Sequence, residues 1–246
     1  MQKLLLCSIC FVQVFALATF IFNRSAAALT PEKMLEKVHW LGKQASVKIE
    51  AGDKLIYIDP YQIAEVTNDA DIILITHDHQ DHYSVGDIEK VMKAETVFVA
   101  PQKLAKQIDV KFKTKAIAVE PGMSTEVDGL PIEVVPAYNI VKTQYHPKEK
   151  KFVGYIVTID GVRIYHAGDT ERIPEMKDIT CDIVMLPLGQ TYTMNSVEEA
   201  AEAVLDVQAK IAIPIHFGMY EGTLKDAQKF TELLKGKVQV VIQGKK

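Results

Sequence analysis

This sequence contains few cysteines and fewer basic than acidic residues. Only three of the 246 residues are cysteines, which is too few for a disulfide framework. The 28 lysines and arginines are outnumbered by 32 aspartates and glutamates, so the composition lacks the clustered positive field that nucleic-acid binding requires. We therefore expect a globular protein with no nucleic-acid partner and no disulfide framework.

The longest apolar run lies at the N-terminus. Residues 4–22 carry no charge, Lys3 precedes them, and a small-residue cluster ending at Ala28 follows. A positive start, an apolar stretch and a small-residue end are typical of a secretory signal peptide, while the same run is near the lower limit for a membrane span. We expect residues 1–28 to be a signal peptide, with an uncleaved N-terminal anchor as the alternative. The protein would be exported to the periplasm or secreted, or else membrane-anchored, and it would contact a membrane only if this segment stays uncleaved.

Residues 29–246 show no linker, low-complexity tract or repeat and are predicted to form one domain. Short apolar runs separated by turn signals such as Asp160-Gly161 predict strands, and Ser196 with Glu199 forms a capping pattern that opens a helix. Strands are expected at 45–50, 54–59, 71–76, 96–100, 115–120, 131–136, 152–159, 162–166, 182–186, 210–215 and 238–242, and helices at 87–93, 196–208 and 224–234. Because strands and helices do not alternate strictly, we expect two packed sheets with helices outside.

A histidine cluster directly follows the apolar strand expected at 71–76. Three of the seven histidines, His77, His79 and His82, lie there together with Asp81. A loop at the carboxyl end of a strand can direct such side chains toward one point, and neutral imidazole suits zinc and similar ions. The H-x-H-x-D-H spacing lets the two alternate imidazoles meet one ion while the aspartate and the last histidine meet a second. Catalytic zinc sites use mixed ligands of this kind and leave a position open for water.

Two ions need more ligands than one loop provides. Asp169 and His216 each follow an expected strand, and His146 lies in a polar loop. His166 is a competing candidate, although an alternating position on the strand expected at 162–166 is the simpler place for it. His39 is expected to be structural.

Several segments resemble a known family. Thr76–His82, Gly168–Thr170 and Pro214–Gly218 resemble the metallo-β-lactamase superfamily of metal-dependent hydrolases. Trp40–Gly42, Ile58–Tyr61 and Pro187–Met194 look like its β-lactamase-like branch, which includes ascorbate-phosphate lactonase. The resemblance spans about Val38 to Ile242. It implies an α/β fold, an αββα sandwich of two mixed β-sheets with flanking helices.

The resemblance also implies a ligand set and two divalent metal ions. It assigns His77, His79 and His146 to the first metal, Asp81, His82 and His216 to the second, and Asp169 to a bridge between them. Imidazole ligands favour zinc, while the carboxylates admit manganese or iron.

The function implied by this resemblance is that of an exported metal-dependent hydrolase. A hydroxide bound by the two metals would cleave an ester, lactone or phosphoester bond, and Asp81 would act as the catalytic residue that orients it and relays a proton. The partner would be a small-molecule substrate that is anionic or contains a carbonyl group. The alternative is an exported metal-binding protein that uses the same ligands without turnover.

Overall fold

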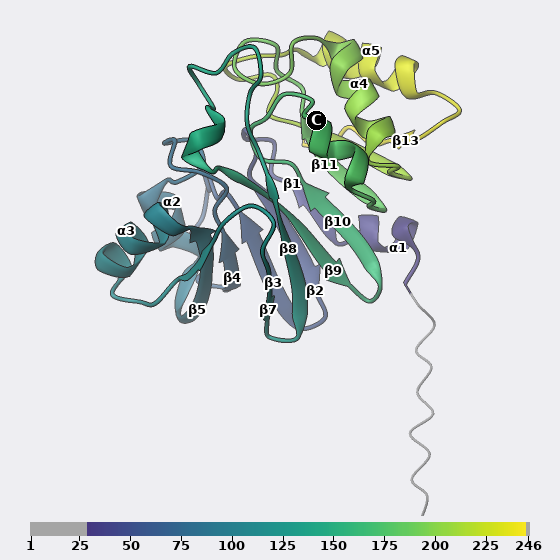
Figure 1. Cartoon of the computed structure of the whole chain (residues 1–246). Coiled ribbons are helices and arrows are strands. Elements are labelled where there is room, and N and C mark those ends of the chain that lie inside the picture. The colour runs from purple at the N-terminus through teal and green to yellow at the C-terminus, as the bar shows by residue number, and fades with distance from the viewer. Residues whose placement is uncertain (1–28, 245–246) are drawn as a thin grey trace, which may run out of the picture.

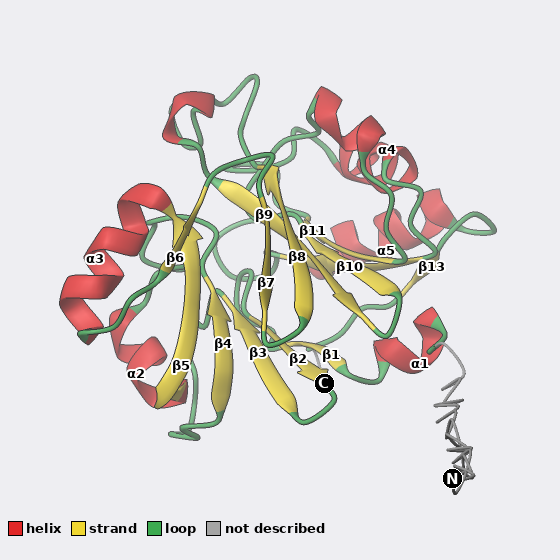
Figure 2. Ribbon diagram, turned by 60° about the horizontal axis from the view of Figure 1, so that its bottom comes forward, coloured by secondary structure: helices red, strands yellow, loops and turns green. Residues whose placement is uncertain are grey.

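Two mixed β-sheets pack face to face in a computed structural model that describes residues 29–244. Helices cover the outer face of each sheet (Figure 1, Figure 2). This arrangement confirms the expected sandwich of two sheets with flanking helices. The expected signal peptide, residues 1–28, lies outside the described residues.

The first sheet has six strands in the order of the sequence. They are β1 (Val38–Trp40), β2 (Val47–Ala51), β3 (Lys54–Ile58), β4 (Ala70–Leu74), β5 (Met92–Pro101) and β6 (Ile117–Val119). The pairs from β1 to β3 are antiparallel, and those from β3 to β6 are parallel. The carboxyl ends of β3 and β4 therefore lie at one edge of this sheet.

The second sheet has seven strands, in the order β13-β12-β11-β10-β9-β8-β7. They are β7 (Ser124–Val127), β8 (Leu130–Pro136), β9 (Val153–Ile159), β10 (Val162–His166), β11 (Ile183–Pro187), β12 (Ile211–Ile215) and β13 (Gln239–Val240). Strands β10 to β13 are parallel to one another, whereas β7 to β10 pair antiparallel. The carboxyl ends of β10, β11 and β12 therefore share one edge.

The main core fills the space between the sheets, where alternate strand residues such as Ile49, Ile72 and Val157 are fully buried. Tyr155 of β9 crosses this layer, because its hydroxyl donates to the carbonyl of Ile75 at 2.7 Å. A second core lies beneath α2 (Val85–Val91) and α3 (Gln102–Phe112) and includes Phe98. On the other side, α4 (Val197–Asp206) and α5 (Leu224–Leu234) cover the second sheet (Figure 2).

Several elements were not expected. They are α1 (Pro31–Leu35), β1, α3, β7 and the 3₁₀ turns η1 (Lys148–Lys150) and η2 (Pro174–Asp178). Helix α3 begins at Gln102, where its N-cap Pro101 makes no side-chain cap hydrogen bond, so the usual sequence signal for a helix start is missing. The strand expected at 238–242 is shorter in the structure, where β13 has only two residues. Among residues 29–244, no helix is long and apolar enough to span a membrane.

Gly154 of β9 is a position where only glycine fits. A Cβ there would lie 2.7 Å from the His166 carbonyl oxygen and 2.8 Å from that of Ala167. Because both obstacles are backbone, we expect Gly154→Ala to lower the free energy of unfolding by about 1–3 kcal/mol, as overpacking does. Gly86 in α2 is the matched control, since a Cβ there meets nothing within 4 Å and alanine favours a helix. Urea unfolding of both variants measures the difference; equal stabilities would contradict the expectation.

Candidate metal centre

The expected ligands gather where parallel strands of both sheets end. The His77–His82 segment follows β4 of the first sheet, while Asp169 follows β10 and His216 follows β12 of the second. Carboxyl ends of parallel strands are the usual location of ligand sites in open α/β sheets. The facing sheets thus bring together side chains that are far apart in the sequence.

His146 comes from the long irregular connection between β8 and β9. A buried carboxylate holds this connection in place: Glu171 accepts hydrogen bonds from the backbone N–H groups of Ile140, Val141 and Lys142 at 2.7, 2.7 and 2.9 Å. The backbone N–H of Asn139 donates to the His146 carbonyl at 2.7 Å. Glu171 follows Asp169 by two residues, so one segment supplies a candidate ligand and fixes the loop of another.

Three histidines form the first group. Candidate ligand atoms of His77, His79 and His146 all lie within 4.8 Å of one another. His77 Nε2 and His79 Nδ1 are 3.1 Å apart. The Thr76 hydroxyl lies 2.9 Å from His77 Nδ1, the nitrogen that does not face His79. The arrangement suits a cation bound by three imidazoles.

Asp81, His82 and His216 form the second group, again with candidate atoms within 4.8 Å of one another. Asp81 Oδ2 lies 3.9 Å from His82 Nε2 and 3.8 Å from His216 Nε2. Both histidines are buried, whereas the Asp81 side chain keeps 23% of its surface exposed. Asp81 is therefore the member of this group that also reaches solvent.

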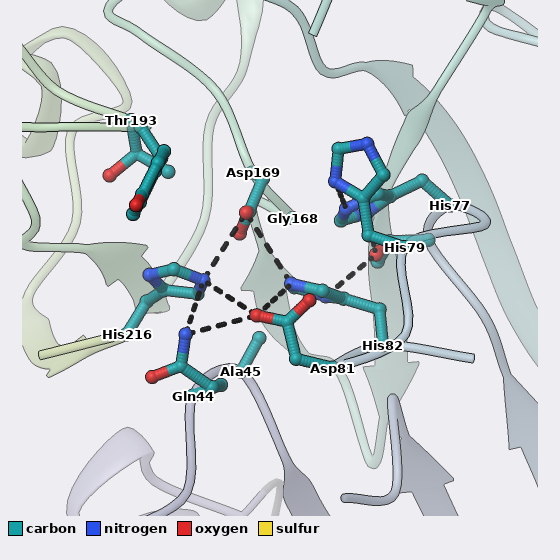
Figure 3. Close-up of polar contacts among 12 residues, drawn as sticks. Gln44, Ala45, His77, His79, Asp81, His82, Gly168, Asp169, Thr193 and His216 are labelled. Carbon is teal, nitrogen blue, oxygen red and sulfur yellow. Dashed lines mark hydrogen bonds and ion pairs between the residues drawn. The ribbon is translucent and has the colours of Figure 1, made fainter. Parts of the chain in front are cut away.

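Asp169 stands between the two groups (Figure 3). Its Oδ2 lies 3.4 Å from His146 Nε2 in the first group, and 3.4 Å and 3.2 Å from the Nε2 atoms of His82 and His216 in the second. The carboxylate is almost fully buried. One carboxylate thus touches imidazoles of both groups, the position that a shared ligand needs.

Two further carboxylates orient the histidines of the second group. Asp59 Oδ2 lies 2.8 Å from His82 Nδ1, and Glu221 Oε1 lies 2.9 Å from His216 Nδ1. A carboxylate on the outer nitrogen fixes the tautomer and directs Nε2 inward, an arrangement common in metal sites. Asp59 also lies near His77 and His82 as a possible third group, but its oxygens already accept from the Thr76 backbone and hydroxyl at 2.8 and 2.5 Å. We assign it to positioning.

His166 lies outside both groups. Its Nε2 is 2.8 Å from the Ala45 carbonyl, and its Nδ1 accepts from the Gly168 backbone N–H at 3.2 Å. With both ring nitrogens engaged by backbone, His166 supports the turn that presents Asp169. His39 is half-exposed and pairs with Glu50 at 3.3 Å. Of the two competing histidines, the structure brings His146 into the centre.

The chain was compared with known proteins. The profile of the family described as "Beta-lactamase superfamily domain" matches residues 37–216. The chain belongs to this family of metal-dependent hydrolases. It is 35% identical over 221 residues to a UPF0173 metal-dependent hydrolase of Pyrococcus abyssi, with 84% of this chain and 95% of the relative covered. A relative from Pyrococcus furiosus with the same description is 37% identical over 221 residues, at the same coverage.

Solved structures agree with this family. A protein from Parabacteroides distasonis described as a metal-dependent hydrolase is 34% identical, with a TM-score of 0.72 over 84% of this chain and 92% of that one. A metallo hydrolase from Ignicoccus hospitalis, 23% identical, shares the fold with a TM-score of 0.68 over 84% and 94% of the two chains. The expected membership of the metallo-β-lactamase superfamily is therefore confirmed.

The sequence reasoning missed two site residues of this hydrolase, Gln44 and Glu221. The Gln44 side-chain amide donates to Asp81 Oδ2 at 3.1 Å and lies 3.0 Å from His216 Nε2 (Figure 3). Gln44, Asp59 and His216 all have positive φ, a conformation that is uncommon for residues other than glycine. The sequence did contain a signal for Glu221, because this carboxylate lies between Gly218 and Gly222 in the loop that follows His216. For Gln44 the sequence offered none.

Charge at the centre of the hydrolase is unevenly distributed. Burial lowers the pKa of His77 and of His79, so these imidazoles are neutral and able to bind a cation. Burial opposes the charge on His216 as well, but the neighbouring Asp169 and Glu221 carboxylates raise its pKa to about 10. Burial alone would raise the pKa of Asp169, yet the charges of His216 and His82 hold it well below its usual range. Without metal, protons on the second group balance the buried carboxylate.

An open cavity of about 630 Å³ leads to the centre. Five of the expected ligands line it: His79, Asp81, His146, Asp169 and His216. Pockets for small molecules fall in the range of roughly 300–1,000 Å³. The hydrolase can therefore admit a small molecule to the point where the two groups meet.

Metal uptake by the hydrolase is expected to release protons. His216 must lose its proton to bind a cation, and its pKa of about 10 keeps it protonated at neutral pH. Occupation of the second group at pH 7 should release at least about one proton, and the apparent affinity should rise about tenfold per pH unit between pH 7 and 9. Calorimetric titration in buffers of different ionisation enthalpy counts these protons. Uptake of a second equivalent with no proton release would contradict the assignment of His216.

Proposed function

We propose that this chain hydrolyses an ester, lactone or phosphoester bond at a pair of divalent cations. The first cation would bind to His77, His79 and His146, the second to Asp81, His82 and His216, and Asp169 would be shared. The observation that carries the proposal is the position of Asp169, whose Oδ2 lies within 3.4 Å of imidazoles from both groups.

The side chains present fit such a pair of ions. His82 Nε2, His146 Nε2 and Asp169 Oδ1 are buried and make no hydrogen bond among residues 29–244. Buried polar atoms without partners are rare because they cost free energy, so these three atoms are suited to bind a cation. The imidazole-rich donor set supports zinc as the ion, and the carboxylates admit manganese or iron.

Two cations held by these residues would lower the pKa of a bound water molecule and polarise the substrate's carbonyl or phosphoryl oxygen. The chain's own residues do the rest. Asp81, partly exposed at the cavity, is placed to accept a proton from the attacking water and to pass it to the leaving group. Gln44 fixes the Asp81 carboxylate by donating to Oδ2. Asp59 and Glu221 keep two imidazoles oriented.

The competing function is metal binding without turnover. The cavity favours hydrolysis, because a storage site has no need of a space of about 630 Å³ in which Asp81 is exposed beside the ligands. Protein stripped with a chelator and reloaded with Zn²⁺, Mn²⁺ or Fe²⁺ should hydrolyse at least one of p-nitrophenyl acetate, γ-butyrolactone and bis(p-nitrophenyl) phosphate. Tight binding of two ions with no turnover of any of these would favour the metal-binding function instead.

Export is part of the proposal. The positive, apolar and small-residue order of residues 1–28 supports a signal peptide cleaved after Ala28. Mass spectrometry of the protein expressed in a Gram-negative host should find a mature chain in the periplasm that begins at Leu29. An intact N-terminus in the membrane fraction would support the anchor, and an intact N-terminus in the cytoplasm would contradict export.

A further inference from the structure

Tyrosines dominate the part of the cavity lining that does not belong to the candidate ligands. Tyr61, Tyr145, Tyr192 and Tyr220 all line it, with Met219 and Gln80. The four tyrosines come from four different loops, each of which leaves the end of a strand near the metal centre. The cavity therefore offers the substrate a largely aromatic surface next to the reacting atoms.

The tyrosines are arranged in two pairs. Tyr145 and Tyr192 pack edge to face, with ring centroids 4.9 Å apart. The hydroxyls of Tyr61 and Tyr220 lie 2.7 Å apart in a hydrogen bond. This hydrogen bond uses one of the two hydroxyl hydrogens, so the pair offers a ligand its ring carbons and one free hydroxyl hydrogen.

Backbone hydrogen bonds fix the loops that carry two of these tyrosines. The Tyr192 N–H donates to Glu221 Oε2 at 2.6 Å, and its carbonyl accepts from the Asn139 side chain at 2.7 Å. The Tyr61 N–H donates to Ser46 Oγ at 3.1 Å. A preformed aromatic wall binds a flat or apolar group without ordering loops first, which lowers the cost of binding.

Outside the candidate ligands, the same lining offers no positive side chain. None of the lining residues within 29–244 is a lysine or an arginine. Lys142 lies on the same loop as Tyr145, but its Nζ donates to the carbonyls of Gln190 and Met194 at 3.2 and 2.8 Å and does not line the cavity. An anionic group on the part of the substrate remote from the reacting bond would therefore find no lysine or arginine in this lining to pair with.

We propose that the substrate is an uncharged ester or lactone with an apolar, preferably aromatic, group that lies against the four tyrosines. This inference rests on the proposed hydrolytic function and narrows its substrate class. Uncharged esters and lactones are favoured over sugar phosphates and over other substrates that carry an anionic group away from the reacting bond.

Three acetate esters test the inference with the metal-loaded full-length protein. Methyl acetate and benzyl acetate have leaving alcohols of similar basicity, so their difference reports the aromatic ring. The third ester, 4-(acetoxymethyl)benzenesulfonate, adds a charge remote from the reacting bond. We expect kcat/KM for benzyl acetate to exceed that of each of the others at least about tenfold, the scale on which an apolar pocket discriminates.

Variants at Tyr192 locate the source of this preference. Tyr192→Ala should reduce the benzyl-to-methyl ratio of kcat/KM by about tenfold, while Tyr192→Phe, which keeps the ring, should retain most of it. Binding provides a readout that does not depend on turnover. N-benzylacetamide should bind the metal-loaded wild type measurably by calorimetry and should bind Tyr192→Ala more weakly.

The outcomes separate this inference from the function on which it rests. Metal-dependent hydrolysis of the esters with no preference for benzyl acetate, or with a preference for the sulfonate, would overturn the substrate class and leave the hydrolase intact. Absence of metal-dependent turnover of any of the three esters would overturn ester hydrolysis, and the substrate class with it.

Discussion

Replacement of Asp169 by alanine is expected to reduce bound metal from two equivalents to one or fewer and to lower kcat/KM by at least about 10³-fold. The carboxylate faces imidazoles of both groups at 3.2–3.4 Å, so its loss removes the one side chain that the two cations would share. A catalytic metal supplies several kcal/mol of charge stabilisation, and each 1.36 kcal/mol corresponds to about a tenfold change in rate.

Both effects of Asp169→Ala can be measured on the same preparation. Inductively coupled plasma mass spectrometry gives the metal content, and steady-state kinetics give kcat/KM. Asp178 is exposed in the turn η2 and belongs to neither group of candidate ligands, so Asp178→Ala is the control and should retain both metals. An Asp169→Ala protein that keeps two equivalents and wild-type turnover would show that the two groups act without a shared ligand.

The second large effect is expected at Asp81. Asp81→Asn should lower kcat by about 10²–10⁴-fold, the range typical of a lost general acid or base, while the group of three histidines keeps its metal. Asparagine preserves the shape of the side chain but removes its charge and its ability to hold the proton. The fall should therefore appear in kcat more than in KM.

The His77–His82 segment supplies a matched control for this variant. Asp78 lies in the same segment, yet it is exposed and belongs to neither group. Asp78→Asn should change kcat less than about twofold, as surface substitutions away from special features do. If Asp81→Asn and Asp78→Asn behaved alike, Asp81 would have no part in proton transfer.

Much of the centre could be predicted because its information is local in the sequence. His77, His79, Asp81 and His82 share one loop, and their spacing after an apolar strand indicates metal binding by itself. Asp169 and His216 also follow strands with clear apolar patterns, so their convergence followed from the two-sheet fold. His146 is different: it lies in an irregular loop held by Glu171, and only the resemblance to the family singled it out.

The features of the site and fold that could not be predicted from the sequence depend on contacts between distant segments. Gln44 lies in the connection between β1 and β2 and Asp81 follows β4, so their contact forms only in the folded chain and no local sequence pattern predicts it. Helix α3 was missed for a related reason: its buried residues Leu104, Ala105 and Ile108 pack on the first sheet, so tertiary burial supports a helix start without a side-chain cap. The tyrosine wall likewise arises from four loops that the fold brings together.

The most direct test of a two-cation hydrolase is a metal titration followed by both binding and turnover. Chelator-stripped protein is supplied with increasing Zn²⁺, and bound metal and hydrolysis of p-nitrophenyl acetate are measured at each step. Binding should saturate at two equivalents per chain, and turnover should be absent without metal and reach its maximum as the second equivalent binds. If no metal bound in stoichiometric amount, or if the stripped protein showed full turnover, the chain would not be a two-cation hydrolase.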